Sequence, residues 1–472
     1  MSGFFTLGET KDRPGVYKRY ENLGTETPGA TEKIAACVVS GNWGPLNKAV
    51  HISPSTDLAT IIGAGTGEKA ITELFAGGVG EAVVVRAGSG GTKGTITLKD
   101  NDSTPANVVT LTALYEGNRA FTITIKTSLE DASLKEATIY EGTTALETVT
   151  FTAGSGEVDG IIAAFANSAY VTATKVAAGT GTLAAVAQAA FTAGTNPTVN
   201  STAYSTAFSA TEAETFDMII TDSNDSAVHA LLLTFIQRMY AEGAYPMAVV
   251  AEASSVAIAT RLTNAATFND EKMHYVLNSW IDTAGTVYDG YLAAARIAGM
   301  ICACPANESL THAVIQGAAK LNEALTNAQV KQALKTGCLC FTLSKGKQVW
   351  IEKAINSLIT LAGNQDAGWK KIRRVKERME LMSRVEETVE GMIGTVDNDS
   401  DGRAAVVAAA QRVIDAMVGE KKLISGTAME DENNPAQGDS AWFVIAVDDL
   451  DSLETIYLTF GFEFAPSAEA AE

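Results

Sequence analysis

Four histidines limit the acid–base chemistry that this chain can perform. They are His51, His229, His274 and His312, and a serine hydrolase needs one histidine beside a serine and an orienting acid. The sequence has no G-x-S-x-G elbow, and the segment Gly426-Thr427-Ala428-Met429 carries alanine where a nucleophilic serine is required. We therefore expect surface or satisfied core histidines, and we predict that the chain is not an enzyme.

A glycine-rich run from Gly63 to Lys69 has the composition of a phosphate-binding loop. Glycines at the start of a helix let backbone amides approach an anion. A P-loop needs Gly-Lys-Ser/Thr, whereas here Gly67 is followed by Glu68, Lys69 and Ala70. Because the Glu68 carboxylate would repel a phosphate, we interpret the run as a flexible turn.

Two C-x-C pairs, Cys302/Cys304 and Cys338/Cys340, raise the question of a zinc site. Residues i and i+2 of a strand share a face, so four thiolates are available as ligands. Both pairs lie in apolar runs, where cysteine behaves as a small buried hydrophobe. This setting favours free buried thiols over zinc.

The segment Asp397-x-Asp399-x-Asp401-Gly402 matches the first half of a calcium loop. Position twelve is Ala408 in place of the bidentate glutamate. A weak calcium site and an aspartate-rich connection that caps the next helix both remain open, and the second is favoured. We predict no cofactor.

Six basic residues fall within nine positions of an otherwise acidic chain. Apolar residues recur at helical spacing through the same segment, at Ile372, Val375 and Met379, which predicts an amphipathic helix with its cations on the exposed face. A docking face for an acidic partner and a merely solvated helix face are the two interpretations. The six residues are Lys370, Lys371, Arg373, Arg374, Lys376 and Arg378.

Bulk composition excludes several classes of protein. A net charge of −20 disfavours direct nucleic-acid binding, and 46% apolar residues indicate a packed globular chain of 472 residues. The N-terminus lacks the pattern of a secretory signal, and no apolar stretch suits a bilayer span. We expect synthesis in a reducing cytoplasm, with no membrane insertion.

The elements that position these residues alternate between strand and helix. A buried strand after Lys33, a helix from about Gly67 to Phe75 and a strand from Ala82 to Gly88 predict an α/β fold with a doubly wound, largely parallel sheet. This core is discontinuous, at 26–92 and 200–345, with an inserted β-rich domain at 93–199. A C-terminal α+β domain is expected at 346–454.

Each end of the chain is predicted to be a strand-like arm without a local partner. The N-terminal arm, 1–25, contains the strand RPGVYKRYE, and the C-terminal arm, 455–472, places Ile456, Leu458, Phe460 and Phe462 on one face before an acidic tail. An unpaired strand can complete the sheet of a neighbour. Because head-to-tail contacts run on as rings or helices, the arms predict a polymer.

Several segments together resemble the sheath subunit of contractile phage tails and of R-type bacteriocins. The insertion near Leu111 to Arg119 resembles the extra domain of sheaths from phages of Gram-positive hosts. The other segments are Arg13–Tyr17 (RPGVY), Gly41–Pro45 (GNWGP), Tyr288–Gly299 (YDGYLAAARIAG), Ile355–Leu358 (INSL) and Asp401–Arg403 (DGR).

The resemblance implies a subtilisin-like core without protease activity. It further implies stacked hexameric rings around an inner tube, and a sheath that contracts to drive the tube through an envelope. The expected location is a virion or phage-tail-like particle assembled in a bacterial cytoplasm, with baseplate and tail terminator proteins as further partners. Another self-assembling protein, of a tube, a capsid or a surface layer, is the alternative.

The resemblance also implies roles for particular residues. Val16, Tyr17 and Tyr20 would pair with Ile456 to Phe462 of neighbouring subunits. Lys370 to Arg378 would face an acidic tube surface from the inner C-terminal domain. Contraction needs hinges, and the composition around Gly24 and Gly29 suits them.

Overall fold

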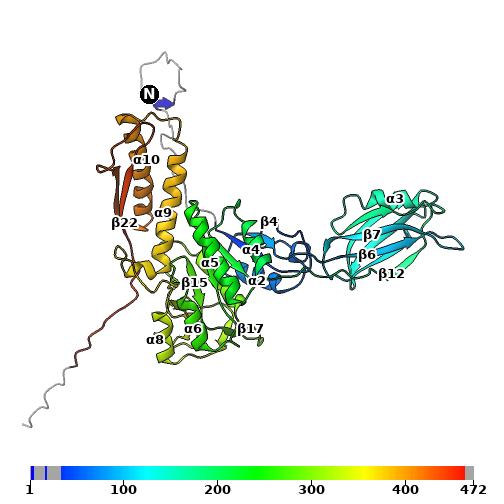
Figure 1. Ribbon diagram of the computed structural model, residues 1–472, viewed down its shortest axis with the longest axis horizontal. Coiled ribbons are helices and arrows are strands. Elements are labelled where there is room, and N and C mark those ends of the chain that lie inside the picture. Colours follow the sequence, from blue (N-terminus) through cyan, green and yellow to red (C-terminus); the bar gives the residue numbers. More distant parts are fainter. Residues whose placement is uncertain (1, 5–15, 19–32, 463–472) are drawn as a thin grey trace, which may run out of the picture. The chain divides into compact units, whose positions relative to one another are not determined.

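The computed structural model describes residues 2–4, 16–18 and 33–462 (Figure 1). Contacts along the chain divide it into two compact units. The larger unit comprises Glu32–Met379 with Leu450–Glu472, and the smaller comprises Met1–Thr31 with Glu380–Asp449. The domain boundaries predicted from the sequence stay predictions.

A seven-stranded sheet forms the centre of the larger unit. All neighbouring strands run parallel except β4, which is antiparallel to β5. Apolar runs such as IAACVV in β3 are buried along almost their whole length, as expected for a sheet covered on both faces. In spatial order the strands are β19 (Cys338–Leu339), β15 (Met273–Val276), β14 (Met247–Val250), β13 (Met218–Thr221), β3 (Ile34–Val39), β5 (Glu81–Arg86) and β4 (Ala49–Ile52).

Helices cover both faces of this sheet. Alternate residues of β3 enter different apolar clusters: Ala35 and Cys37 pack with α2 (Thr66–Ala76) and α7 (Tyr291–Ala303), and Ala36 packs on the opposite face. The predicted mixed α/β fold is confirmed, while its subtilisin-like winding stays a prediction. The helices on the second face are α4 (Ser201–Ser209), α5 (Ser226–Ala241), α6 (Ile258–Ala266) and α8 (Asn327–Lys335), and a short α1 (Leu58–Ile61) precedes α2.

A β-rich domain lies between β5 and α4 in the sequence and appears in cyan in Figure 1. Its two sheets and helix α3 (Glu157–Ala164) share one apolar cluster. One sheet has the order β10 (Thr144–Thr152), β9 (Leu134–Glu141), β8 (Phe121–Thr127), β12 (Val186–Ala190), and the other β11 (Val171–Lys175), β7 (Asn107–Glu116), β6 (Lys93–Lys99).

Two buried arginines join this domain to the α/β core. Arg86, at the end of β5, donates to the carbonyl oxygens of Gly41, Gly44 and Glu116 at 2.7–3.0 Å. Arg119 donates to the carbonyl oxygen of Ala59 and pairs with Glu141 at 2.6 Å. Burial lowers the pKa of Arg86 to about 10, so it stays charged at neutral pH.

Short elements complete the larger unit. They form a three-stranded antiparallel sheet, a two-stranded hairpin and one turn of 3-10 helix. These are β17 (Val287–Tyr288), β16 (Trp280–Asp282) and β18 (Ala318–Leu321), then β20 (Phe341–Leu343) and β21 (Val349–Ile351), and η1 (Ala367–Lys370).

The smaller unit is built on two helices and an antiparallel strand pair. Helix α9 (Ile372–Glu390) runs from the larger unit into it, and α10 (Ser400–Gly419) packs with β22 (Leu423–Glu430) and β23 (Phe443–Asp449) through an apolar cluster that includes Val413 and Leu423. The helix expected after the aspartate-rich segment is confirmed as α10. Asp399 is its N-cap, since its carboxylate accepts from the Gly402 amide at 2.8 Å, so the capping interpretation of the aspartate-rich segment is confirmed.

The N-terminal strand has a local partner, contrary to expectation. β2 (Val16–Lys18) pairs in parallel with β1 (Ser2–Phe4), and Gly3 lies opposite Tyr17. A pattern search for hairpins misses such a pair, because parallel neighbours need a longer connection than a tight turn. Tyr20, Gly24 and Gly29 lie outside the described residues.

Candidate assembly site at the root of the C-terminal arm

The basic cluster does not form the exposed face that helical periodicity predicts. Arg373 is buried, and the other five side chains are partly covered. Arg374 pairs with Asp366 at 3.1 Å, and the Arg378 guanidinium lies 3.6 Å from the Trp369 ring centroid. The expectation of an exposed basic face is therefore wrong, while contact with an inner tube stays a prediction.

Lys376, near the start of α9, binds the end of another helix. Its ammonium donates to the carbonyl oxygens of Ile301 and Cys304, at the carboxyl end of α7. The Lys33 ammonium donates to the carbonyl oxygen of Ala303, in the same turn of α7, at 2.5 Å. Cations at a helix C-terminus bind the carbonyl oxygens that have no partner within the helix, and they interact favourably with the negative end of its dipole. The positive charge of Lys376 therefore stabilises α7.

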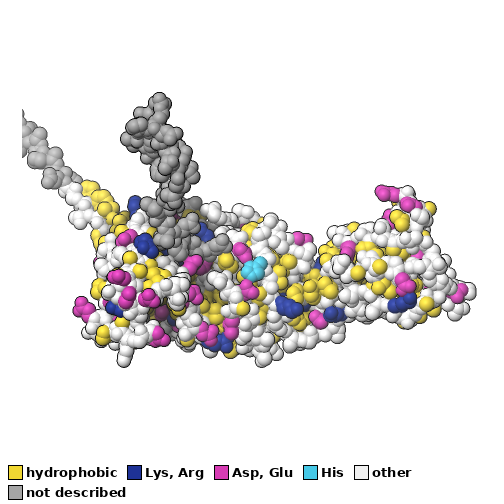
Figure 2. Space-filling model, turned by 90° about the horizontal axis from the view of Figure 1, so that it is seen from above, with side chains coloured by type: hydrophobic (Ala, Val, Ile, Leu, Met, Phe, Trp, Pro, Cys, Tyr) yellow, Lys and Arg dark blue, Asp and Glu magenta, His cyan; other side chains and the backbone are white. Residues whose placement is uncertain are grey.

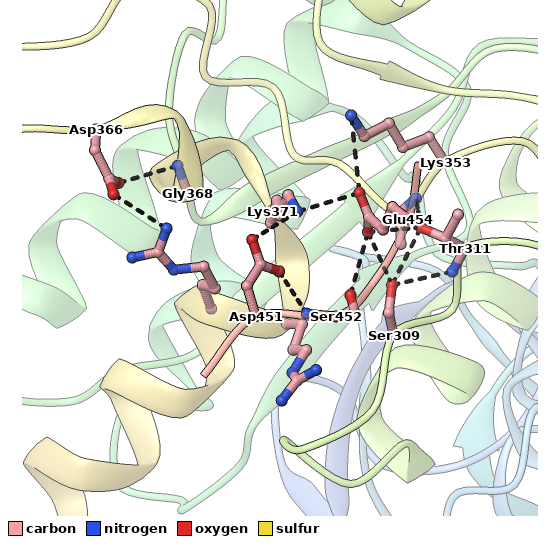
Figure 3. A network of polar contacts seen from close by, with 12 residues as sticks. Ser309, Thr311, Lys353, Asp366, Gly368, Lys371, Asp451, Ser452 and Glu454 are labelled. Atoms are coloured by element: carbon pink, nitrogen blue, oxygen red, sulfur yellow. Dashed lines mark hydrogen bonds and ion pairs between the residues drawn. The ribbon is translucent and has the colours of Figure 1, made fainter. Parts of the chain in front are cut away.

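Lys371 connects the basic cluster to the C-terminal segment, as Figure 3 shows. Its ammonium lies 2.7 Å from Asp451 Oδ2 and 3.2 Å from Glu454 Oε2. The backbone of Lys371 bridges to Ile355, and the neighbouring Ile372 is buried in the main apolar cluster. The cation is thus presented from a fixed part of the core.

Glu454 gathers most of the remaining contacts. Its Oε1 accepts from Thr311 Oγ1 at 3.0 Å and from Ser309 Oγ at 3.3 Å, and its Oε2 lies 3.8 Å from Lys353 Nζ (Figure 3). The Glu454 side chain is 10% exposed. We give the name arm-root latch to six residues: Ser309, Thr311, Lys353, Lys371, Asp451 and Glu454.

The charges of the latch stabilise each other. Burial alone would raise the pKa of Asp451, but the hydrogen bond and charge of Lys371 outweigh it and hold that pKa below its usual value. Burial would lower the pKa of Lys371, yet Asp451 and Glu454 raise it. Both groups are therefore ionised across the neutral pH range.

Beyond Glu454 the chain leaves the body as an exposed segment. Ile456, Leu458, Phe460 and Phe462 are 68–84% exposed, and Figure 2 shows yellow side chains along the segment that leads into the grey C-terminal residues. The predicted strand is absent over the described residues 455–462. A strand needs a ladder partner, and the described part of this single chain provides none here.

The β22–β23 pair also presents apolar side chains to solvent. Within the described residues this sheet has two strands, so each strand has an open edge. The exposed residues on or beside it are Ile424, Met429, Trp442, Val444 and Ile445.

Tertiary folding gathers polar groups that sequence reasoning missed. At the carboxyl ends of β3 and β13, Asp222 accepts from Ser40 and Tyr204, both at 2.6 Å, and from Thr66 at the start of α2. A carboxylate thus occupies the start of α2. The turn interpretation holds for Gly63 to Gly65, whereas Thr66 to Lys69 form the first turn of that helix. Single polar residues at strand ends gave too weak a signal for prediction.

The histidines and cysteines take part in surface contacts or in the buried core. His51 bridges Glu81 and Glu214 on the surface, and His312 stacks on Trp350. His229 and His274 are buried. The cysteines are free thiols, all buried except the partly exposed Cys304, and across residues 33–462 no group of three or more His, Cys, Asp or Glu side chains is arranged to hold a metal ion. None of the described helices has the length and apolar character of a membrane span.

Comparison with known proteins places the chain in a family. Residues 197–357 match the family model of the phage tail sheath protein central domain, and residues 65–196 match the phage tail sheath protein beta-sandwich domain. The chain belongs to the phage tail sheath protein family. Members of this family are structural proteins that form part of phage or phage-like particles.

Relatives of this sheath protein agree with that assignment. The phage-like element PBSX protein XkdK of Bacillus subtilis is 24% identical over 399 residues, or 79% of each chain. The crystal structure of a sheath tail protein from Desulfitobacterium hafniense has a TM-score of 0.70 at 20% identity, over 92% of this chain and 100% of that chain. The contracted PVC sheath complex of an extracellular contractile injection system has a TM-score of 0.55 at 9% identity, over 96% and 98% of the two chains. The sheath protein therefore shares the fold of these subunits.

Proposed function

We propose that this chain is the subunit of a contractile tail sheath, which polymerises as stacked hexameric rings around an inner tube and shortens to drive the tube through a cell envelope. The observation that carries this proposal is the segment 455–462, whose apolar side chains are exposed beyond a fixed root. Soluble chains seldom expose such a run unless it binds a partner. A second copy of the chain is the partner that a sheath family member requires.

The contact fits addition of a strand to a neighbour's sheet. The C-terminal arm offers alternating apolar side chains, and the β22–β23 sheet offers open edges beside exposed Trp442 and Val444. The N-terminal arm, through Val16, Tyr17 and Tyr20, joins the same contact. A ladder of about five hydrogen bonds at roughly 1 kcal/mol each stabilises one joint by about 5 kcal/mol before apolar packing.

Tube, baseplate and terminator proteins are the further partners of this proposal. Of the six basic residues, all but the buried Arg373 are partly exposed, so these five remain available in part to an acidic tube surface. The proposal covers a virion and a bacteriocin particle alike, because the same sheath subunit would serve in either.

Truncation of the arm tests the proposal. The full chain and a chain ending at Phe464, which lacks only the acidic tail, should form striated tubes in electron micrographs, because both retain the apolar segment. A chain ending at Glu454 should sediment as a folded monomer with an unchanged circular dichroism spectrum. Tubes from the chain ending at Glu454, or monomers from all three chains, would overturn the proposal.

A further inference from the structure

The C-terminal arm is attached to the larger unit and not to the unit that precedes it in sequence. Strand β23 ends at Asp449 in the smaller unit, whereas Leu450 onward belongs to the larger unit. The five residues between β23 and the exposed segment include both acids of the arm-root latch. The exit point of the arm is therefore defined by contacts with the α/β core.

The latch holds the root of the arm by more polar contacts than a flexible tether requires. The Glu454 carboxylate has three hydroxyl donors on one oxygen, from Ser309, Thr311 and Ser452, and two ammonium groups near the other, and only 10% of its side chain is exposed. Asp451 also accepts from the Ser452 amide at 2.8 Å, which fixes the carboxylate against the backbone of the root. Charge-assisted hydrogen bonds that are partly shielded from water are stronger than exposed pairs.

The cationic side of the latch is held by the core. Lys371 precedes α9 and is bridged to Ile355, and Thr311 Oγ1 accepts from the Ala354 amide at 3.1 Å. Lys353 lies two residues after the end of β21, and Ile351 and Ala354 are buried in the main apolar cluster. A pull on Glu454 is thus transmitted through short irregular segments whose neighbouring residues, Ile351, Ala354 and Ile372, are buried in the core.

We propose that the arm-root latch is the point at which tension in the C-terminal arm enters the subunit, so that neighbours pull directly on the α/β core. This inference rests on the proposed sheath function, because tension exists only in a polymer. Lys371, Lys353, Ser309 and Thr311 are then positioning residues: they fix the arm's exit and do not contact the neighbour.

The latch itself is tested in the full-length monomer, independently of assembly. Lys371→Met keeps the alkyl stem and removes the charge, and Glu454→Gln keeps a hydrogen-bonding group. Hydrogen exchange at the Ser452 amide, which donates to the latch carboxylate of Asp451, should become at least tenfold faster in both variants, and faster in wild type as salt screens the pairs. Glu130→Gln, the same change on an exposed side chain of the β-rich domain, should leave exchange unchanged. Unchanged exchange in both variants would overturn the latch.

The mechanical role is tested in tubes assembled from the same proteins. Variant tubes should form, since the apolar segment is intact, but should break into short stacks when contraction is triggered, while wild-type and Glu130→Gln tubes contract whole. Intact contraction of variant tubes would overturn the tension proposal. Failure of wild type to polymerise would overturn the sheath function and leave the monomer result standing. If a lowered melting temperature shows that one variant is misfolded, Lys353→Met provides the same test, because the Lys353 side chain is 40% exposed.

Discussion

At the scale of single residues, buried titratable groups set the pH range of the fold. His274 lies in β15, completely buried, and neither ring nitrogen has a hydrogen-bond partner among the described residues. Desolvation lowers its pKa from 6.5 to about 3, although Asp270 acts in the opposite direction. Because the unfolded chain binds this proton more readily, stability from neutral His274 is complete above pH 6.5 and is lost as the pH falls toward 3.

Replacing His274 with leucine should flatten this pH dependence. Between pH 6.5 and 5, the wild-type free energy of unfolding should fall by about 1.4 kcal/mol per pH unit more steeply than that of His274→Leu, since one proton separates the two chains. Urea unfolding of both proteins at each pH measures the difference. Equal slopes would show that His274 titrates normally in the folded state.

At the scale of elements, the close approach of α2 and α7 organises one face of the core. A Cβ atom added at Gly299 would lie 2.2 Å from the Leu74 carbonyl oxygen and 2.8 Å from the Gly77 Cα. The Glu73–Arg296 ion pair, 2.6 Å long, joins the same helices. Glycine in mid-helix is unfavourable by about 1 kcal/mol relative to alanine, so packing and not propensity explains it here.

Gly299→Ala should therefore destabilise the chain despite its better helix propensity. We expect a loss of about 1–3 kcal/mol by overpacking, measured by urea unfolding. Gly419→Ala is the matched control, because Gly419 ends α10 with nothing within 4 Å of the added atom. That control should leave stability unchanged or slightly raised, and equal effects from the two variants would contradict the packing argument.

At the scale of the whole molecule, contraction demands two arrangements of one chain. Rigid bodies with packed cores cannot deform continuously, so the change must fall on connecting segments. The described C-terminal arm is fixed at its root by the latch, and the N-terminal arm is the other link between subunits in the proposed sheath. Gly24 and Gly29, at and just beyond the end of that arm, have the composition of a hinge.

The double variant Gly24→Ala/Gly29→Ala should assemble but not contract. Alanine restricts backbone dihedrals without removing any apolar contact of the arms. Tube lengths before and after a contraction trigger, read by electron microscopy, measure the effect, with Gly363→Ala in an exposed loop as control. A normal change in length for the double variant would exclude these glycines as hinges.

Local patterns determined much of this protein. Continuous apolar runs predicted the parallel strands β3 and β5, and apolar spacing predicted that Ile372, Val375 and Met379 would be buried on one face of α9, as they are. The calcium-like segment was correctly interpreted as a cap for α10. These features depend on neighbours within a few positions, which a sequence displays directly.

Only the tertiary structure decided what the cations and acids contact. Periodicity assigns charged side chains to the face away from the core, yet Lys376 meets the end of α7, and Lys371 meets Asp451. The partners lie some 70 to 80 positions away in the sequence, and no local pattern encodes such a meeting. The sequence by itself determined that the C-terminal arm is apolar and precedes an acidic tail. Folding decided where that arm is anchored, because an ion pair forms between whichever groups the packed core brings within reach.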